Sequence, residues 1–122
     1  MPFDKQILVL AEDPTVRHTK QLVLEHLGFS VVAVATVREV EYVVARSKFD
    51  LVILGRAVTD AHKKAAAEGV RTRHPYLPIL EICNVSPCIT NPDYILRSPN
   101  PEDLAEMVKA ILRPSATSAE FV

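Results

Sequence analysis

The position in this sequence where chemistry is most expected is occupied by a glycine. The apolar run from Leu51 to Leu54 is short, shows no polar alternation and stops at Gly55. This pattern is typical of a strand buried on both faces of a parallel sheet. Ligands and reacting groups gather at the carboxyl ends of such strands. Gly55 therefore stands where a functional side chain is expected, and it has none.

The cysteines and histidines give only weak signals for metal or redox chemistry. Cys83 and Cys88 are separated by four residues and have no histidine nearby, so their spacing is poor support for a redox pair or half of a metal site. No histidine has a ligand spacing with a carboxylate; the four are His18, His26, His62 and His74. We predict free thiols and no metal site among these residues.

Length and composition predict one cytoplasmic domain. A chain of 122 residues with 48% hydrophobic and 24% charged residues suits a single domain with a substantial core. The net charge of -1 gives no argument for nucleic acid or an acidic membrane as partner. No apolar run approaches the roughly 20 residues that span a bilayer, and the first residues lack the apolar core of a signal peptide.

Predicted strands and helices alternate along the chain. Short apolar runs predict strands at residues 6–10, 30–34, 51–54, 78–83 and 94–96. Capping residues and apolar periodicity predict helices at residues 14–26, 37–47, 61–74 and from 101 onward. Residues 84–93 contain prolines and asparagines without helical periodicity and are predicted to be a loop. This order predicts a doubly wound α/β sandwich in one domain, residues 1–113, followed by a tail at 114–122.

Five segments of the sequence resemble the receiver domain of bacterial two-component response regulators. They are ILVLAEDPTVR, LEHLGFSVVAVAT, FDLVILG, VRTRHPYLPIL and DYILRSPNPEDL. The resemblance implies a flavodoxin-like, five-stranded parallel sheet in the order 2-1-3-4-5. In that family an acidic pair after the first strand and an aspartate ending the third bind magnesium, and that aspartate accepts a phosphoryl group. A hydroxyl after strand four and a lysine after strand five bind the phosphoryl oxygens.

This sequence departs from the receiver pattern at most of the positions that carry the chemistry. Ala11 and Glu12 stand at the acidic pair, and Gly55 stands at the phosphoryl acceptor. Cys83 replaces the hydroxyl residue and Arg97 replaces the lysine. The segment between Cys83 and Arg97 is also shorter than in the family by about two helical turns. We therefore expect the fourth helix of the family to be shortened or missing.

These departures predict a pocket without phosphotransfer chemistry. A glycine cannot act as a nucleophile, and Glu12, even with Asp13, is a poor carboxylate set for magnesium. We expect no cofactor, with Glu12 as the only candidate metal ligand. We expect Arg97 to pair with Glu12 or Asp13, although Asp13 is most simply a helix cap. Arg56 has two interpretations: it points into the vacated pocket, or it is solvated.

Glu81 is the other unusual residue, because it lies inside a predicted interior strand. Strand alternation places Glu81 on the same face as Ile79 and Cys83, where an unpaired carboxylate would be costly. Loss of the covering helix is expected to open Glu81 to water or to a partner. A basic run on the third helix is predicted to be a solvated face: Lys63, Lys64, Arg71 and Arg73.

The predicted function is that of a pseudo-receiver, a signalling module that is not an enzyme. It would contact an unidentified protein partner without phosphorylation. One alternative is a working receiver with an unusual acceptor such as Thr59 or Asp60. The other is a small-molecule or redox module of the flavodoxin-like type, against which stands the lack of a glycine-rich phosphate loop after the first strand. The sequence carries no signal for the oligomeric state.

Overall fold

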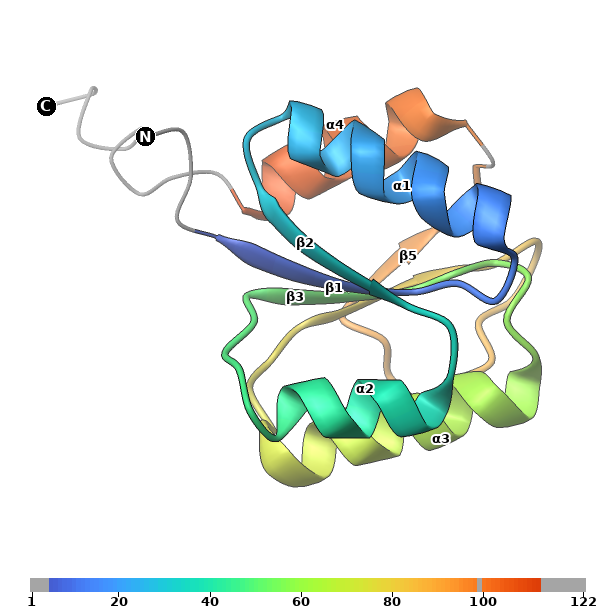
Figure 1. The fold of residues 1–122 in the computed structure, drawn as a ribbon. Coiled ribbons are helices and arrows are strands. Elements are labelled where there is room, and N and C mark those ends of the chain that lie inside the picture. Colours follow the sequence, from blue (N-terminus) through green and yellow to red (C-terminus); the bar gives the residue numbers. More distant parts are fainter. Residues whose placement is uncertain (1–4, 99, 113–122) are drawn as a thin grey trace, which may run out of the picture.

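The computed structural model describes residues 5–98 and 100–112 and contains a five-stranded parallel sheet in the order β2-β1-β3-β4-β5 (Figure 1). The strands are β1 (Gln6–Leu10), β2 (Ser30–Val34), β3 (Leu51–Leu54), β4 (Ile79–Ile82) and β5 (Tyr94–Leu96). The helices are α1 (Pro14–His26), α2 (Val37–Val44), α3 (Asp60–Arg73) and α4 (Pro101–Ile111). The predicted α/β sandwich and strand order are confirmed. The predicted tail at 114–122 lies outside the described residues.

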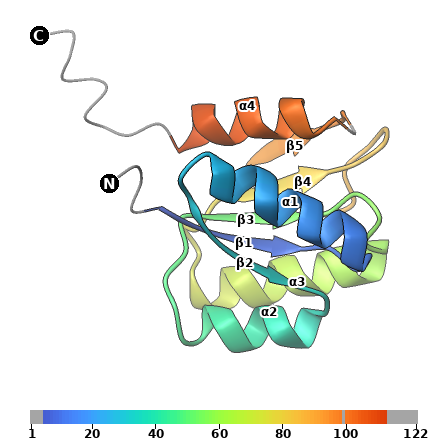
Figure 2. The same ribbon diagram turned by 45° about the horizontal axis from the view of Figure 1, so that its top comes forward.

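Two apolar layers sandwich the sheet. Helices α1 and α4 cover one face and helices α2 and α3 cover the other (Figures 1 and 2). Strand alternation divides β1 between them, because Leu8 and Leu10 pack toward α2 and α3 while Ile7 and Val9 pack toward α1 and α4. Every residue of β3 is fully buried, as expected of a central strand covered on both faces. Each such side chain contributes about 1.5–3 kcal/mol of hydrophobic stabilisation.

Two of the predicted caps are confirmed, at the starts of α1 and α2. The carboxylate of Asp13 accepts hydrogen bonds from the backbone N–H groups of Thr15 and Val16 at 2.8 and 3.1 Å. Thr36 and Glu39 form the predicted capping box at the start of α2, although this helix ends at Val44, short of the predicted Ser47. None of the helices described here has the length and apolar character that crossing a bilayer requires.

The start of α4 differs from the prediction. Asn100 occupies the cap position but its side chain makes no capping hydrogen bond. Instead the hydroxyl of Ser98 accepts a hydrogen bond from the Asn100 backbone N–H at 3.1 Å and also hydrogen-bonds the carboxylate of Asp103. Ser98, which follows β5, therefore bonds both the backbone at Asn100 and a side chain in the first turn of α4.

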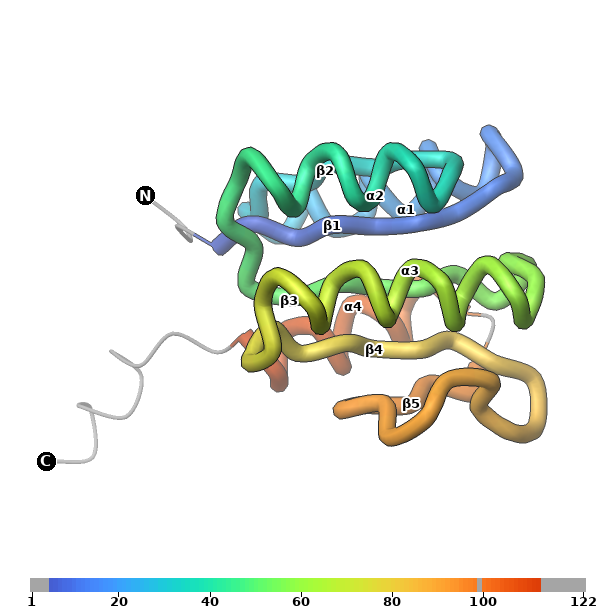
Figure 3. The backbone as a smooth tube through the Cα atoms, turned by 90° about the horizontal axis from the view of Figure 1, so that it is seen from below, coloured from blue at the N-terminus to red at the C-terminus, as the bar shows by residue number. Residues whose placement is uncertain are grey.

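The predicted loop between β4 and β5 is confirmed. Residues 84–93 form bends without a helix, and the tube in Figure 3 passes from β4 to β5 without a helical coil. Arg71 on α3 fastens this loop through hydrogen bonds to the carbonyl oxygens of Thr90 and Asn91 at 2.7 and 2.6 Å. The loop thus lies against α3.

Two predictions about charged residues in this region are wrong. Glu81 is not opened to water, because its side chain is 0% exposed. Lys63 is not on a solvated face, because it is 2% exposed and its ammonium lies 3.0 Å from Glu81 Oε2. Glu81 also accepts hydrogen bonds from the backbone N–H groups of Cys88 and Ile89 at 2.7 and 3.2 Å. The loop therefore folds over Glu81 in place of the missing helix. Lys63 balances the charge of the carboxylate, and the two loop amides satisfy its oxygens.

Candidate functional site

The carboxyl ends of the strands bring three of the predicted site positions to one edge of the sheet. The backbone N–H of Ala11 donates to Val34 O at 3.0 Å, and that of Gly55 donates to Leu10 O at 2.8 Å. The N–H of Cys83 donates to Leu96 O at 3.0 Å. Each of these residues extends the hydrogen-bonded sheet by one step. Ala11 and Cys83 are each 3% exposed, so neither side chain is presented to solvent at this edge.

A side chain at Gly55 would begin in tight contact with the backbone of the neighbouring strand. A Cβ atom built on Gly55 would lie 2.9 Å from Leu10 O and 3.5 Å from both Cα and Cβ of Ala11. Contacts below 3.0 Å require the backbone to shift. The backbone of β1 thus approaches Gly55 closely, so a side chain at this position would have to displace main chain.

Glu12 has a partner that sequence reasoning missed. Its Oε2 lies 2.6 Å from Nδ1 of His62, in the first turn of α3, with side-chain exposures of 32% and 56%. A pair this exposed contributes at most about 1 kcal/mol. The strand order could have indicated this pair, because β1 and β3 are neighbours and the segments that follow them lie at the same edge of the sheet.

The predicted pairing of Arg97 with Glu12 or Asp13 is wrong. Arg97 donates from Nε to the carbonyl oxygen of Val85 at 2.7 Å. Asp13 is engaged in capping α1, so its simpler interpretation as a cap is confirmed. Arg97 therefore fastens the end of β5 to the loop between β4 and β5 and does not close the acidic site.

The residues at this edge do not fit a magnesium ion. Magnesium prefers near-octahedral oxygen ligands that include carboxylates. Ala11 and Gly55 offer no carboxylate, Glu12 contacts His62 and Asp13 caps a helix. Within residues 5–98 and 100–112 there is no group of three or more His, Cys, Asp or Glu side chains placed to hold a metal.

Asp60 and Cys88 form a second polar contact, on the α3 side of the edge. The Cys88 thiol donates to Asp60 Oδ1 at 2.9 Å. This hydrogen bond, followed by burial, raises the pKa of Cys88 to about 11. Both Cys83 and Cys88 are free thiols, and Thr59 caps α3 by accepting from the His62 backbone N–H at 3.3 Å. The side chains of Thr59 and Asp60, the alternative acceptors, are thus already engaged in hydrogen bonds.

Removing the Asp60 carboxylate is expected to make Cys88 more reactive. In Asp60→Ala the pKa of Cys88 should fall toward its ordinary value, so alkylation by iodoacetamide at pH 8 should speed up about tenfold or more. The rate is measured by mass spectrometry of the folded protein, and Cys83, which is buried, serves as the internal control. Equal Cys88 rates in the wild type and the variant would show that the contact with Asp60 does not control the thiol.

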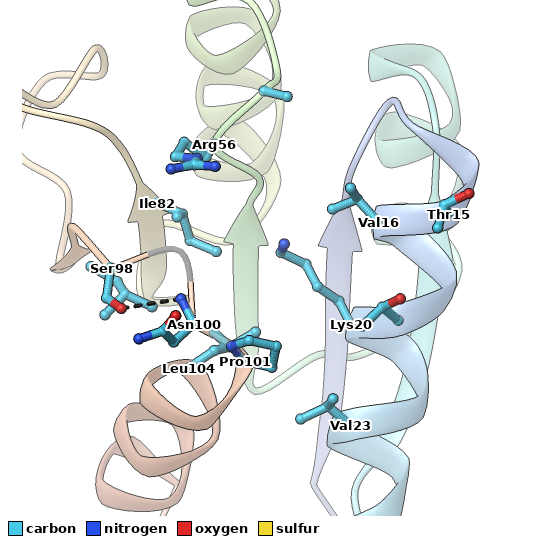
Figure 4. Close-up of a pocket in the computed structure, with 13 residues that line it drawn as sticks. Thr15, Val16, Lys20, Val23, Arg56, Ile82, Ser98, Asn100, Pro101 and Leu104 are labelled. Atoms are coloured by element: carbon cyan, nitrogen blue, oxygen red, sulfur yellow. Dashed lines mark hydrogen bonds between the residues drawn. The ribbon is translucent and has the colours of Figure 1, made fainter.

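A cavity of about 240 Å³ lies beside the strand ends, between α1 and α4. In Figure 4 its walls are α1 on one side and the start of α4 on the other, with Ile82 of β4 and Arg56 after β3 between them. Arg56 is among the residues that line this cavity. It is exposed and donates to Asn84 Oδ1 at 3.3 Å. Lys20 of α1 reaches inward. Burial, and then the positive charge of Arg56, lower the pKa of Lys20.

Comparison with known proteins identifies the fold. No family model and no curated protein matches the chain. Solved structures do match. A CheY-like response regulator receiver domain protein from Methanospirillum hungatei JF-1 superposes with a TM-score of 0.77 and 21% identity, over 90% of this chain and 94% of that chain.

Two further structures give the same result. A two-component response regulator from Clostridium difficile has a TM-score of 0.76 and 23% identity, over 92% of this chain and 98% of that one. The chemotaxis response regulator CheY4 of Vibrio cholerae has a TM-score of 0.77 and 20% identity, over 90% of this chain and 100% of that one. The chain therefore has the flavodoxin-like fold of receiver domains.

Proposed function

We propose that this chain is a receiver-like signalling module that acts by contact with a protein partner and does not use phosphorylation. In this role it is not an enzyme and needs no cofactor. The observation that carries the proposal is the environment of Gly55. Its position at the end of β3 offers no nucleophile, and the first atom of any side chain there would lie only 2.9 Å from the carbonyl oxygen of Leu10.

The other positions at the strand ends support the same function. Glu12 is engaged by His62, and Cys83 continues the sheet with its side chain buried. Arg97 donates to Val85 O instead of facing the carboxylates. An incoming phosphoryl group would find neither an acceptor nor a magnesium ligand set at this edge.

The surface around β4 and β5 supports a single signalling conformation. Three side chains hold the loop at residues 84–93 along its length. Arg97 binds the carbonyl oxygen of Val85 near the β4 end, and the Glu81 carboxylate accepts from the amides of Cys88 and Ile89 in the middle. Arg71 binds the carbonyl oxygens of Thr90 and Asn91 toward β5. These contacts involve no phosphoryl group. The loop can therefore present one fixed surface to a partner.

The experiment that tests the proposal is incubation with acetyl phosphate and magnesium, followed by intact mass spectrometry. We expect no added phosphoryl group on this protein under conditions that modify a phosphorylatable receiver domain in the same tube. A magnesium-dependent phosphoryl adduct would overturn the proposal. Asp60→Asn and Thr59→Val variants would then show whether either residue is the acceptor.

The partner contact is tested separately by affinity capture from the native cells with wild-type protein and with Arg97→Ala. Arg97→Ala releases the loop at Val85 without altering α1 or α2. We expect the wild type to retain the same specific partner with or without acetyl phosphate, and Arg97→Ala to retain less of it. Capture that requires acetyl phosphate would contradict the proposed mode of action.

A further inference from the structure

The cavity between α1 and α4 has the form of a small ligand site. Its volume of about 240 Å³ equals that of about eight water molecules in the liquid. It lies at the carboxyl ends of β3, β4 and β5, the edge at which α/β sheets of this kind bind ligands. A molecule of about ten non-hydrogen atoms would fill it.

The charge of the cavity has one sign. Two basic side chains, Lys20 and Arg56, line it, and none of the lining residues is acidic. Lys20 is half-buried and makes no hydrogen bond or ion pair within the described part of the chain. A partly desolvated ammonium without a partner is unfavourable. An anion in the cavity would supply the missing acceptor and would reduce the repulsion between Lys20 and Arg56.

The rest of the lining is mainly apolar. Val16 and Val23 project from α1 on either side of Lys20 (Figure 4). Ile82, Leu96 and Leu104 belong to β4, β5 and α4 and are each at most 7% exposed. Binding pockets of this type combine an apolar lining with a few polar groups that orient the ligand.

We infer that this cavity binds a small organic anion, with its carboxylate or phosphate group on Lys20 and Arg56 and its apolar body between α1 and α4. The inference does not rest on the proposed protein contact, and the cavity lies beside Gly55 at the same edge of the sheet. It gives the domain a ligand site beside Gly55, a position that itself offers no reacting side chain.

The test is a titration followed by amide NMR of the full chain, with three probes of similar size. Benzoate and phenyl phosphate carry the anion, and benzamide has the shape of benzoate without the charge. We expect benzoate or phenyl phosphate to bind with a dissociation constant on the order of 1 mM or tighter. The shifts should centre on Lys20, Ala57 and Leu104, which line the cavity. Benzamide should bind at least about tenfold more weakly, since it cannot pair with the cations.

Charge-removing variants give the matched controls. Lys20→Met and Arg56→Gln should each weaken the anionic probe about tenfold, the size expected for one lost charged hydrogen bond. Lys64→Met removes the same charge from exposed α3, which lies across the sheet (Figure 1), and should leave binding unchanged. Comparison of the two anionic probes shows whether the site prefers carboxylate or phosphate.

Three results would overturn the inference. The first is no binding of either anion up to about 10 mM, well above the expected constant. The second is equal binding of benzamide and benzoate. The third is equal weakening by Lys64→Met and Lys20→Met, which would show that the anions respond only to overall charge. Because Lys20 and Arg56 are not core residues, their variants are expected to fold, and their amide spectra report this directly.

Discussion

Replacement of Lys63 by methionine should lower the free energy of unfolding by about 3–5 kcal/mol. Methionine has a similar length and fills the space beneath β4, but it leaves the fully buried carboxylate of Glu81 without its cation. The lysine also donates to the carbonyl oxygen of Ile82 at 2.8 Å, so this acceptor also loses its partner. Urea unfolding followed by circular dichroism measures the change.

Two further variants isolate the cause. Lys64→Met removes the adjacent charge from an exposed position and should change stability by less than about 0.5 kcal/mol. The double variant Lys63→Met with Glu81→Gln should recover most of the loss, because glutamine is neutral and still offers an oxygen to the amides of Cys88 and Ile89. A cost below about 1 kcal/mol for Lys63→Met alone would mean that Glu81 finds water after all.

The same pair makes stability depend on acid pH. Burial raises the pKa of Glu81, but the hydrogen bonds from Cys88 N–H, Lys63 and Ile89 N–H outweigh it, so the pKa is lowered in the folded protein. The unfolded chain therefore takes up the proton first as pH falls below about 4.3. The contribution of Glu81 is complete above that pH and is lost as pH falls through the folded pKa. Glu81→Gln should flatten this part of the stability profile.

Restoring the acceptor by Gly55→Asp should destabilise the protein by about 1–3 kcal/mol, the usual cost of overpacking, without creating a phosphorylation site. The new Cβ would lie 2.9 Å from the carbonyl oxygen of Leu10, which belongs to the sheet backbone and cannot move aside cheaply. Thermal unfolding and intact mass after acetyl phosphate treatment measure the two effects.

Gly69→Ala is the control for Gly55→Asp. The Cβ at this position in α3 would meet Cγ of Glu41 at 3.2 Å, and that exposed side chain can turn away. The exchange should stabilise the helix by up to about 1 kcal/mol, because alanine is the better helix former. A Gly55→Asp protein as stable as wild type and phosphorylated in magnesium would show that β1 and β3 can separate at low cost.

The fold could be predicted because its signals are local. The uninterrupted apolar run from Leu51 to Leu54 indicates a buried strand by itself. The caps at Asp13 and Thr36 are indicated by residues close by in the sequence. The segment between Cys83 and Arg97, which is shorter than in receiver domains, also correctly predicted the missing helix. For Asn100 the local signal was misleading, because its side chain makes no capping hydrogen bond and the hydroxyl of Ser98 instead bonds the Asn100 backbone N–H and the carboxylate of Asp103.

The site was harder to predict because its contacts join distant parts of the chain. Lys63 lies in a charged run, which favours a solvated position, yet it shares the buried stripe of α3 with Ala66, Ala67 and Val70. That spacing indicates a position toward the core, where Lys63 bonds Glu81 and the carbonyl oxygen of Ile82. His62 and Glu12 are fifty residues apart, and only the completed sheet order brings them together.

The carboxylate beneath the loop has a further consequence for exchange with solvent. Outside regular secondary structure, amide hydrogens are usually replaced quickly through local fluctuations. The amides of Cys88 and Ile89 donate to the buried carboxylate of Glu81, which also bonds Lys63 of α3. Their deuterium uptake should therefore be as slow as that of the central strand, so that this irregular segment melts with the body of the domain.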